Sequence, residues 1–442
     1  MTVPREPGPR SREIVAREAR HIAPGYQSFA LYSELAMARG SGSRLWDEDG
    51  NEYIDFIAGI AVGSIGHCHP HYVEALKRQA ERLTFGSFTT ETRARFLELM
   101  AKVTPEGLTR IQLFSGGAEA VEAGLRLAKA ATGRHEVVGF WGGFHGKTGG
   151  VLGLLGSDFK HHQGPFLPGQ YSTPYADCYR CPLRLRYPDC GIACAEYVRD
   201  VIRYQTGGEI AAIIVEPIQG TAGNVIPPDG FLRAIQSVAR DHGALLFADE
   251  MITGFGRTGA MWGAAHEGVV PDIMTVGKGV GGGFPLAGVV STDKLTAAKP
   301  WSNPSFSSSS YGGNPLAAAA GLAALEIILN EDLVKNADRV GAIMLTELER
   351  LKEKYRTIGE VRGRGLLLGI ELVEDRVTRR PIGKEITRDL YQECLRRGLV
   401  AMTYSPTIRI NPPLLITEDL AREGLAILDE ALGVVLSRHG RD

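Results

Sequence analysis

Short apolar runs recur along the chain between about residues 110 and 276, and each ends near a glycine or an acidic residue. These runs are "RIQLF", "HEVVGF", "EIAAIIV", "GALLFAD" and "DIMTV". Continuous apolar runs of this length are typical of strands that are buried on both faces. Helical stretches follow some of them, as "SGGAEAVEAGLRLAKAATG" follows the first run. Strands that alternate with helices predict an α/β fold with a parallel sheet.

The chain from about residue 316 onward has a different pattern. The stretch "PLAAAAGLAALEIILNEDLVKNADRVGAIMLTELERLKEKY" has helical periodicity along its length. "VRGRGLLLGIELV" and "TIRINPPL" each predict a strand, and "TRDLYQECLRRG" and "TEDLAREGLAILDEALGVVLSRHG" predict helices. Helices and strands mixed on this smaller scale predict an α+β domain at the C-terminus. At the other end, we expect an irregular start followed by a short helix.

Length and charge narrow the class of protein. The chain has 442 residues, enough for two domains, and a formal net charge of -2. This balance argues against an electrostatic binder of nucleic acid or of a membrane surface. No apolar stretch has the length of a membrane span, and the N-terminal segment has arginines but no hydrophobic segment of the kind a secretory signal needs. We expect a cytoplasmic protein.

Four of the six cysteines lie close together in "CYRCPLRLRYPDCGIAC", as Cys178, Cys181, Cys190 and Cys194. A C-x-x-C pair followed by two more cysteines resembles a zinc knuckle. The second pair is spaced C-x-x-x-C and the connecting stretch is short, which favours reduced thiols that pack in a loop. The three histidines of "GHCHPHY" have no accompanying carboxylate pattern. We therefore assign no metal, although sequence leaves a metal at the cysteines open.

Residues with possible chemistry fall at the ends of the expected strands. They are Gly117, Phe144, Glu216, Asp249 and Lys278. In open α/β sheets, ligands bind beyond the carboxyl ends of the strands. We expect these five residues to lie near one site.

Lys278 stands in "TVGKGVGGGFP", where an apolar strand meets a glycine-rich turn. A buried ammonium tends to lose its proton or find a partner, and a neutral lysine amine is a nucleophile toward carbonyl groups. The alternative is a loop lysine that reaches water. Gly117 and Ala118 begin a helix, where free N–H groups and the helix dipole favour an anion such as phosphate. The alternative there is a tight turn into a packed helix.

Asp249 ends the run "ALLFAD", and Phe144 lies in the turn after another strand. The carboxylate could hold a protonated ring nitrogen, or it could be a helix cap or an ion-pair partner. The phenyl ring could stack on a planar ligand, or it could be a core aromatic. Together, a phosphate cradle, an aromatic platform, a carboxylate and a lysine amine describe a site for pyridoxal 5′-phosphate.

At this point the sequence resembles the class III (ornithine/4-aminobutyrate type) aminotransferases of fold type I. The motifs that carry the resemblance are "YIDFIAGIAVGSIGHCHP", "FSGGAEAVEAGLRLA", "FHGKT", "EPIQG", "DEMITGFGRTG", "GKGVGGGFPLAG" and "SSSSYGGNPLAAAA". The resemblance as a whole extends over the chain from about Leu45 to the last helix.

The resemblance implies a large domain whose mainly parallel, seven-stranded sheet is flanked by helices, and a smaller α+β domain. We expect residues 61–320 to form the large domain and residues 321–442 the small one, with residues 1–60 as an N-terminal segment that packs with the small domain. The resemblance also implies a homodimer with both active sites at the subunit interface, and sequence leaves open whether dimers pair into tetramers.

The resemblance assigns roles to the candidate residues. Lys278 carries the cofactor as an aldimine and later moves the Cα proton, Asp249 pairs with the ring nitrogen, and Gly117 and Ala118 donate to the phosphate. Ser310 stands where the family usually has a threonine that reaches the phosphate of the neighbouring subunit.

The resemblance places five further residues around the cofactor. Phe144 stacks on one face of the ring with His145 beside it, and Met251 packs on the other face. Glu216 and Gln219 of "EPIQG" support the site from behind.

The expected substrate residues include departures from the family pattern. Arg409 in "TIRINPPL" matches the arginine that binds a substrate carboxylate, and Ile60 and Phe88 line or border the pocket. Lys147 replaces the arginine that grips a distal carboxylate in the 4-aminobutyrate enzymes, and lysine lacks the bidentate fork. Thr221 replaces a glutamate that neutralises the carboxylate-binding arginine. Without that glutamate, the sequence favours α-amino acids over 4-aminobutyrate, or an Arg409 side chain that swings.

A further departure is Ile252, which replaces a glutamine that often bonds the phenolic oxygen of the cofactor. The sequence predicts a ping-pong aminotransferase that moves an amino group from an amino acid or amine to a 2-oxo acid. The alternative is an amino-acid racemase or epimerase on the same scaffold. A non-catalytic protein is disfavoured because Lys278 and Asp249 are both present.

Overall fold

The chain divides into two compact units in a computed structural model that describes residues 5–441. The terminal unit comprises Met1–Pro70 and Lys335–Asp442, and the central unit comprises His71–Val334. Helix α11 (Pro315–Asn330), which a boundary at residue 320 would cut, lies wholly in the central unit. It packs along α5 (Glu91–Val103) in that unit. The boundary between the two units therefore comes after the end of α11.

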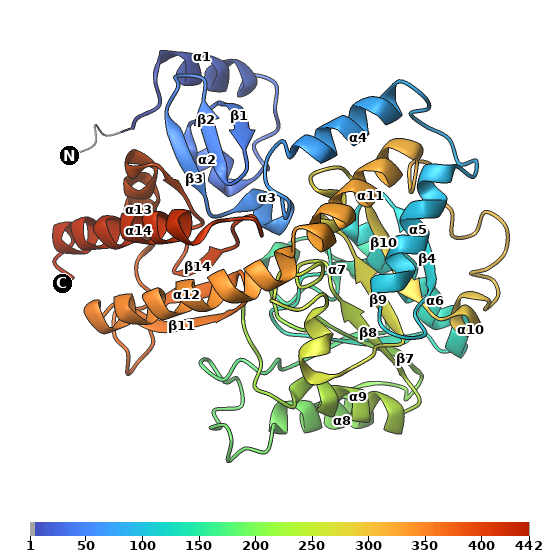
Figure 1. Cartoon of the computed structure of the whole chain (residues 1–442). Helices are drawn as coiled ribbons and strands as arrows, with labels where there is room; N and C mark the ends of the chain where they lie inside the picture. The colour runs from blue at the N-terminus through green and yellow to red at the C-terminus, as the bar shows by residue number, and fades with distance from the viewer. Residues whose placement is uncertain (1–4, 442) are drawn as a thin grey trace. The chain divides into compact units, whose positions relative to one another are not determined.

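The central unit is built on a seven-stranded sheet (Figure 1). Its strands lie in the order β4 (Arg110–Phe114), β10 (Ala287–Ser291), β9 (Ile273–Val276), β8 (Leu245–Asp249), β7 (Ile210–Val215), β5 (Glu136–Phe140) and β6 (Gln170–Thr173). Strand β10 runs antiparallel to both neighbours, and the other neighbouring strands are parallel. The predicted mainly parallel sheet is confirmed, and each of the five apolar runs forms one of its strands.

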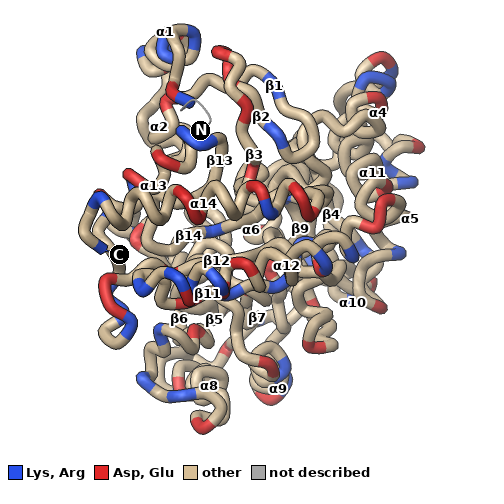
Figure 2. The backbone as a smooth tube through the Cα atoms, turned by 60° about the vertical axis from the view of Figure 1, so that its left-hand side comes forward, with Lys and Arg blue, Asp and Glu red and all other residues tan. Residues whose placement is uncertain are grey.

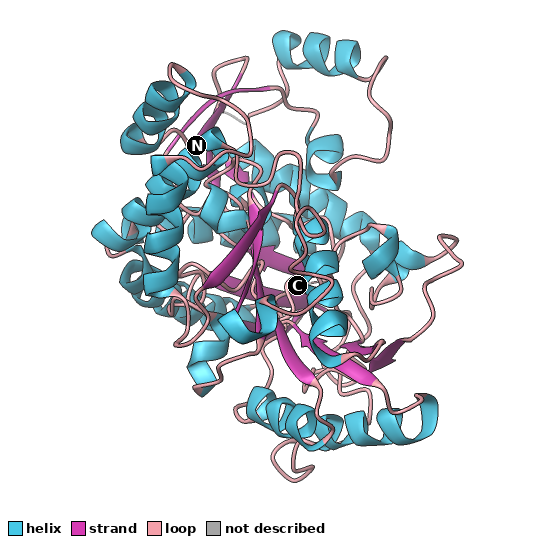
Figure 3. Ribbon diagram, turned by 90° about the vertical axis from the view of Figure 1, so that its right-hand side faces the viewer, coloured by secondary structure: helices cyan, strands magenta, loops and turns pink. Residues whose placement is uncertain are grey.

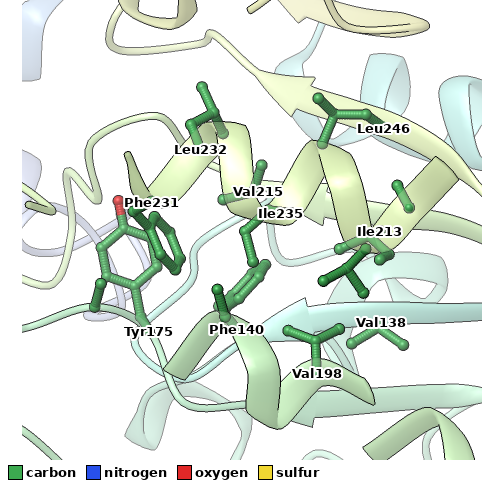
Figure 4. Close-up of a cluster of buried hydrophobic side chains, with 14 of the residues drawn as sticks. Val138, Phe140, Tyr175, Val198, Ile213, Val215, Phe231, Leu232, Ile235 and Leu246 are labelled. Atoms are coloured by element: carbon green, nitrogen blue, oxygen red, sulfur yellow. The ribbon is translucent and has the colours of Figure 1, made fainter. Parts of the chain in front are cut away.

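Helices cover both faces of this sheet (Figure 3). Helix α6 (Gly117–Thr132) packs on one face, and α8 (Ala193–Gln205) and α9 (Phe231–Asp241) pack on the other. The strand side chains alternate between these two layers, as the pleat requires. Val138 and Phe140 join the core under α8 and α9 (Figure 4), whereas Val137 joins the core under α6.

The remaining elements of the central unit are helices that connect or flank the strands of this sheet. They are α4 (Pro70–Ala80), α7 (Gly149–Leu152), η1 (Asp158–Lys160), η2 (Gly263–Glu267), η3 (Lys278–Gly281) and α10 (Asp293–Thr296).

The terminal unit contains two small sheets. One has the order β1 (Met37–Ser41), β2 (Arg44–Asp47), β3 (Glu52–Asp55), β13 (Leu399–Val400), and the other has the order β11 (Ile358–Arg364), β12 (Leu367–Leu372), β14 (Thr407–Ile410). Its helices are α1 (Pro9–Glu18), α2 (Ser28–Ser33), α3 (Ala58–Ala61), α12 (Leu333–Lys354), α13 (Lys384–Arg397) and α14 (Glu418–Arg438). Basic and acidic residues alternate along α12 (Figure 2).

One expectation for the C-terminal part needs correction. The stretch "VRGRGLLLGIELV" is not one strand but the hairpin β11–β12, which turns at Gly365 with a φ of 56°. The long helical stretch is divided into α11 and α12 next to Asp332, whose φ is 52°. The short N-terminal helix is α1, and residues 1–4 of the expected irregular start lie outside the described residues. Within residues 5–441, none of the helices has the length and apolarity to cross a membrane.

Candidate active site

Lys278 lies one residue after β9, beyond Gly277, and opens the short helix η3. Its φ is 45°, in the left-handed region that side chains other than glycine seldom adopt. Such backbone strain persists only where the surrounding structure holds it, and it gathers at functional sites. The half-buried lysine is therefore fixed at the carboxyl end of a sheet strand.

Asp249 ends β8, the neighbour of β9, and its carboxylate is 1% exposed. His145 Nδ1 donates to Asp249 Oδ2 at 2.7 Å. The backbone N–H of Met251 and the hydroxyl of Thr275 donate to Oδ1 at 3.1 and 3.2 Å. These donors offset the cost of burying a charged carboxylate. Sequence analysis did not find Thr275; its only signal was a lone hydroxyl inside the apolar run "DIMTV".

His145 is buried beside Asp249. Burial acts to lower the pKa of His145, but the hydrogen bond and the negative charge of Asp249 outweigh it and leave that pKa raised. The raised pKa favours the imidazolium form of His145, which places a positive charge next to the Asp249 carboxylate. The pair therefore presents a buried carboxylate that can hold a protonated ring nitrogen.

Glu216 braces two loops at the same edge of the sheet. Its carboxylate accepts the backbone N–H of Phe144 at 2.9 Å and that of Gly220 at 3.0 Å. Gln219 ties the same two loops together, because its side chain donates to the Trp141 carbonyl at 2.8 Å. Both residues thus support the loop that carries Phe144 through backbone contacts.

The ionisation of Glu216 is shifted by its surroundings. Burial raises the pKa of Glu216 to about 7, while the charge of His145 opposes this and that of Asp249 adds to it.

The helix α6 begins beside these loops. Its first turn carries the N–H groups of Gly117 and Ala118, for which the helix itself supplies no acceptor. The preceding N–H groups of Ser115 and Gly116 instead donate to the Glu119 side chain, at 3.1 and 3.4 Å. Glu119, three residues after the N-cap glycine, is a capping signal that sequence analysis missed.

Glycines near the site allow several of the predicted residues to lie in close contact. A Cβ on Gly277 would lie 2.5 Å from Met251 Sδ, and one on Gly117 would lie 3.2 Å from the same atom. Met251 is therefore wedged between the start of α6 and the residue before Lys278. A Cβ on Gly146 would lie 2.3 Å from the Ala118 Cβ, so the loop with Phe144 and His145 rests on the first turn of α6.

Lys147 is held by an aromatic pair. Its Nζ lies 4.2 Å from the centroid of the Phe159 ring and 6.0 Å from that of Phe144. The two rings meet edge to face at 6.1 Å. Sequence analysis did not single out Phe159, because it lies in an irregular loop without a recognisable pattern. Thr221 is half-buried in the loop after Gln219.

The remaining predicted residues lie in two loops of the central unit and in the terminal unit. Phe88 is 86% exposed in the loop between α4 and α5, and Ser310 is exposed in the loop between α10 and α11. Arg409 and Ile60 belong to the terminal unit. Arg409 is half-buried in the edge strand β14, opposite Gly369 of β12.

Two smaller observations concern Ile252 and the cysteines. Ile252 is buried, and its side chain fills the space where a Cβ on Gly220 would stand. The six cysteines are thiols, and the four in the 178–194 segment line one apolar cavity.

Among residues 5–441, no group of three or more His, Cys, Asp or Glu side chains is arranged to hold a metal ion.

Comparison with known proteins places the chain in a family. Residues 28–432 match the family described as Aminotransferase class-III. The chain is 38% identical to the acetylornithine aminotransferase of Methanopyrus kandleri, over 94% of this chain and 99% of that protein. It is 34% identical to the leucine/methionine racemase of Thermococcus litoralis, over 96% of each chain. The crystal structure of an amine transaminase from an uncultivated Pseudomonas species, in its PLP-bound form, superposes with a TM-score of 0.87 at 30% identity, over 94% of this chain and 99% of that one.

The residues described above fit the cofactor of this family. Pyridoxal phosphate needs an amine for its aldehyde, a carboxylate for its ring nitrogen and N–H donors for its phosphate. The amine of Lys278, the buried carboxylate of Asp249 and the first turn of α6 meet these needs from neighbouring parts of the central unit. The chain therefore belongs to the class III aminotransferases and is a pyridoxal-phosphate-dependent aminotransferase of fold type I.

Proposed function

We propose that this aminotransferase takes α-amino acids as donors and 2-oxo acids as acceptors, with Arg409 binding the α-carboxylate. The observation that carries the proposal is in the sequence: the chain has Arg409, and it has threonine at position 221 where related enzymes have a glutamate. A guanidinium binds a carboxylate through two parallel charge-assisted hydrogen bonds. With threonine at position 221, no carboxylate from that loop competes for Arg409.

The residues of the central unit divide the chemistry between them. Pyridoxal phosphate supplies an aldehyde carbon that bonds amines and a ring that accepts the electrons left at Cα. Lys278 Nζ would hold the cofactor through its aldehyde carbon and, once the donor amine has replaced it there, would carry the proton from the donor Cα to that carbon. Asp249, which His145 orients through a hydrogen bond, would pair with the ring nitrogen. Phe144 and Met251 would pack on the two faces of the ring, and the N–H groups of Gly117 and Ala118 would bind the phosphate.

We also propose that the enzyme works as a homodimer. Phe85, Phe88, Phe306 and Tyr311 expose 63–86% of their surface in two loops of the central unit. Exposed large apolar side chains gathered in this way mark interfaces. Ser310 adjoins Tyr311, which supports a role for this loop in the site of the neighbouring subunit. The cytoplasmic location expected from the sequence stays a prediction.

A substitution at Arg409 tests the proposed donor class. Arg409→Lys should raise KM for α-amino acids by about tenfold or more, since a charge-assisted hydrogen bond is worth ~1.5–3 kcal/mol. It should leave KM for simple amines unchanged, because these have no carboxylate. Thr221→Glu should also raise KM for α-amino acids, because the new carboxylate competes for Arg409.

The matched control is Arg380→Lys, which changes an exposed arginine of the terminal unit that is paired with Glu374. We expect this variant to behave as the wild type. Equal effects of Arg409→Lys on amino acids and on simple amines would remove the proposed role of Arg409.

A second candidate function is racemisation of amino acids, which the similarity to the leucine/methionine racemase favours. A racemase must return the proton to the opposite face of Cα, and therefore needs an acid or a water across from Lys278. Polarimetry without an acceptor distinguishes the two activities: a racemase abolishes the optical rotation of an L-amino acid without forming a 2-oxo acid.

A further inference from the structure

Four consecutive residues of the terminal unit, Ala58–Ala61, adopt a left-handed conformation. Their φ angles are 46° at Ala58, 63° at Gly59, 66° at Ile60 and 61° at Ala61. Each L-residue in a left-handed helical turn costs roughly 1–2 kcal/mol, and a β-branched residue there is a marked outlier. Three of these four residues are not glycine, so the turn stores strain.

A buried carboxylate holds this turn in place. Asp55 is 2% exposed and ends β3, and its Oδ1 accepts the backbone N–H groups of Ile57 and Ala58, both at 2.8 Å. His67 Nε2 donates to Asp55 Oδ2 at 2.8 Å. The backbone of His67 is itself fixed by two hydrogen bonds with Gly42, at 2.8 and 2.9 Å. The two side chains thus connect the strained turn to the rigid part of the unit.

The left-handed turn leaves the side chain of Ile60 partly exposed. Ala58 and Ala61 are buried, whereas Gly59 is exposed and Ile60 is half-buried. Glycine would adopt this backbone conformation without strain. An isoleucine at position 60 therefore adds strain that the turn does not need, which points to a use for its side chain.

The surroundings of Ile60 connect it with Arg409 inside one unit. Ile60 and Tyr404 pack against the same buried cluster, which includes Tyr53, Tyr391 and Met402. Burial raises the pKa of Tyr404, and the charge of Arg409 acts on it in the opposite direction, so Tyr404 lies within electrostatic range of Arg409. Arg409 also forms an isolated backbone bridge with Met402 of this cluster.

We propose that Asp55 and His67 are positioning residues, which hold the left-handed turn so that Ile60 limits the size of the donor side chain next to Arg409. The proposal rests on the proposed function, in which Arg409 binds the α-carboxylate. Ile60 then determines which amino acids fit, and the Asp55–His67 pair acts only through Ile60.

The test compares kcat/KM for a small donor, alanine, and a branched donor, leucine, in holoenzyme variants. Ile60→Gly should raise the leucine-to-alanine ratio by roughly tenfold or more, the scale on which one or two methylene groups in a pocket discriminate. Its Tm should fall little or not at all, because relief of backbone strain offsets the lost packing. His67→Leu, at a side chain that is 31% exposed, should shift the ratio in the same direction.

Two further variants separate positioning from general stability. His67→Gln places an amide nitrogen where Nε2 stands and should restore the wild-type ratio. Glu136→Gln is the matched control: Glu136 is also buried, at 4% exposure, and accepts the backbone N–H groups of Gly207 and Glu209, but it belongs to the central unit and not to the unit that contains the turn. We expect it to lower Tm and to leave the ratio unchanged.

Two results would overturn the proposal. One is an unchanged ratio in Ile60→Gly, and the other is a His67→Leu variant that loses Tm but keeps the wild-type ratio. Failure of the proposed function looks different: neither donor would then be transaminated by the wild-type enzyme or by any variant.

Discussion

At the scale of single residues, the site depends on charges that are buried and paired. The carboxylate of Asp249 at the end of β8 is buried, and His145, Met251 and Thr275 each donate a hydrogen bond to it. Glu216 has a different task, since its two oxygens accept backbone N–H groups of two loops. The Asp249 carboxylate is therefore available for the ring nitrogen of the cofactor, whereas the Glu216 carboxylate holds two loops of the site in place.

The raised pKa of Glu216 predicts a pH-dependent stability. The folded protein binds this proton up to a pH of about 7, whereas the unfolded chain releases it near 4.5. The contribution of Glu216 to the free energy of unfolding is therefore fully present below pH 4.5. It is lost as pH rises to about 7, which lowers that free energy by up to roughly 3 kcal/mol. Thermal unfolding of the cofactor-free enzyme should show Tm falling over this window, and Glu216→Gln should remove that part of the slope. Equal slopes for the two proteins would mean that Glu216 does not titrate there.

At the scale of elements, the sequence predicts the sheet well because apolar runs and glycine-rich turns are local signals. The carboxyl ends of β8 and β9 bring Asp249 and Lys278 to one edge, as the parallel arrangement requires. The hairpin β11–β12 was taken for one strand, because "GRG" inside an apolar run gives only a weak sign of a turn. The four-stranded sheet of the terminal unit was not predicted, since its strand β13 comes from a segment far along the chain from β1, β2 and β3.

The parts of the site that sequence did not predict depend on tertiary contacts. Phe159 reaches Lys147 and Phe144 from an irregular loop. The strained turn Ala58–Ala61 reads in sequence as "AGIA", which is unremarkable for a right-handed helix. Only the hydrogen bonds from Ile57 and Ala58 to Asp55 reveal why it turns the other way.

At the scale of the whole molecule, the proposed homodimer makes each active site depend on both subunits. Two inactive variants test this: Lys278→Ala lacks the amine, and Ser310→Asp places a negative charge where the neighbouring phosphate should bind. In a mixed dimer, one site combines the intact Lys278 of one subunit with the intact Ser310 of the other. We expect co-expressed variants to regain activity that neither has alone. Dimers that form but stay inactive would contradict a shared site.

The most direct test of the enzyme as a Lys278-dependent aminotransferase is a single half-reaction. Purified holoenzyme is mixed with an L-α-amino acid and no acceptor, and the visible absorbance of the lysine-bound cofactor is followed with the release of 2-oxo acid. We predict that this absorbance disappears while 2-oxo acid forms in an amount equal to the active sites, and that Lys278→Ala shows neither change. Persistent absorbance with loss of optical rotation and no 2-oxo acid would contradict the transaminase and identify a racemase instead.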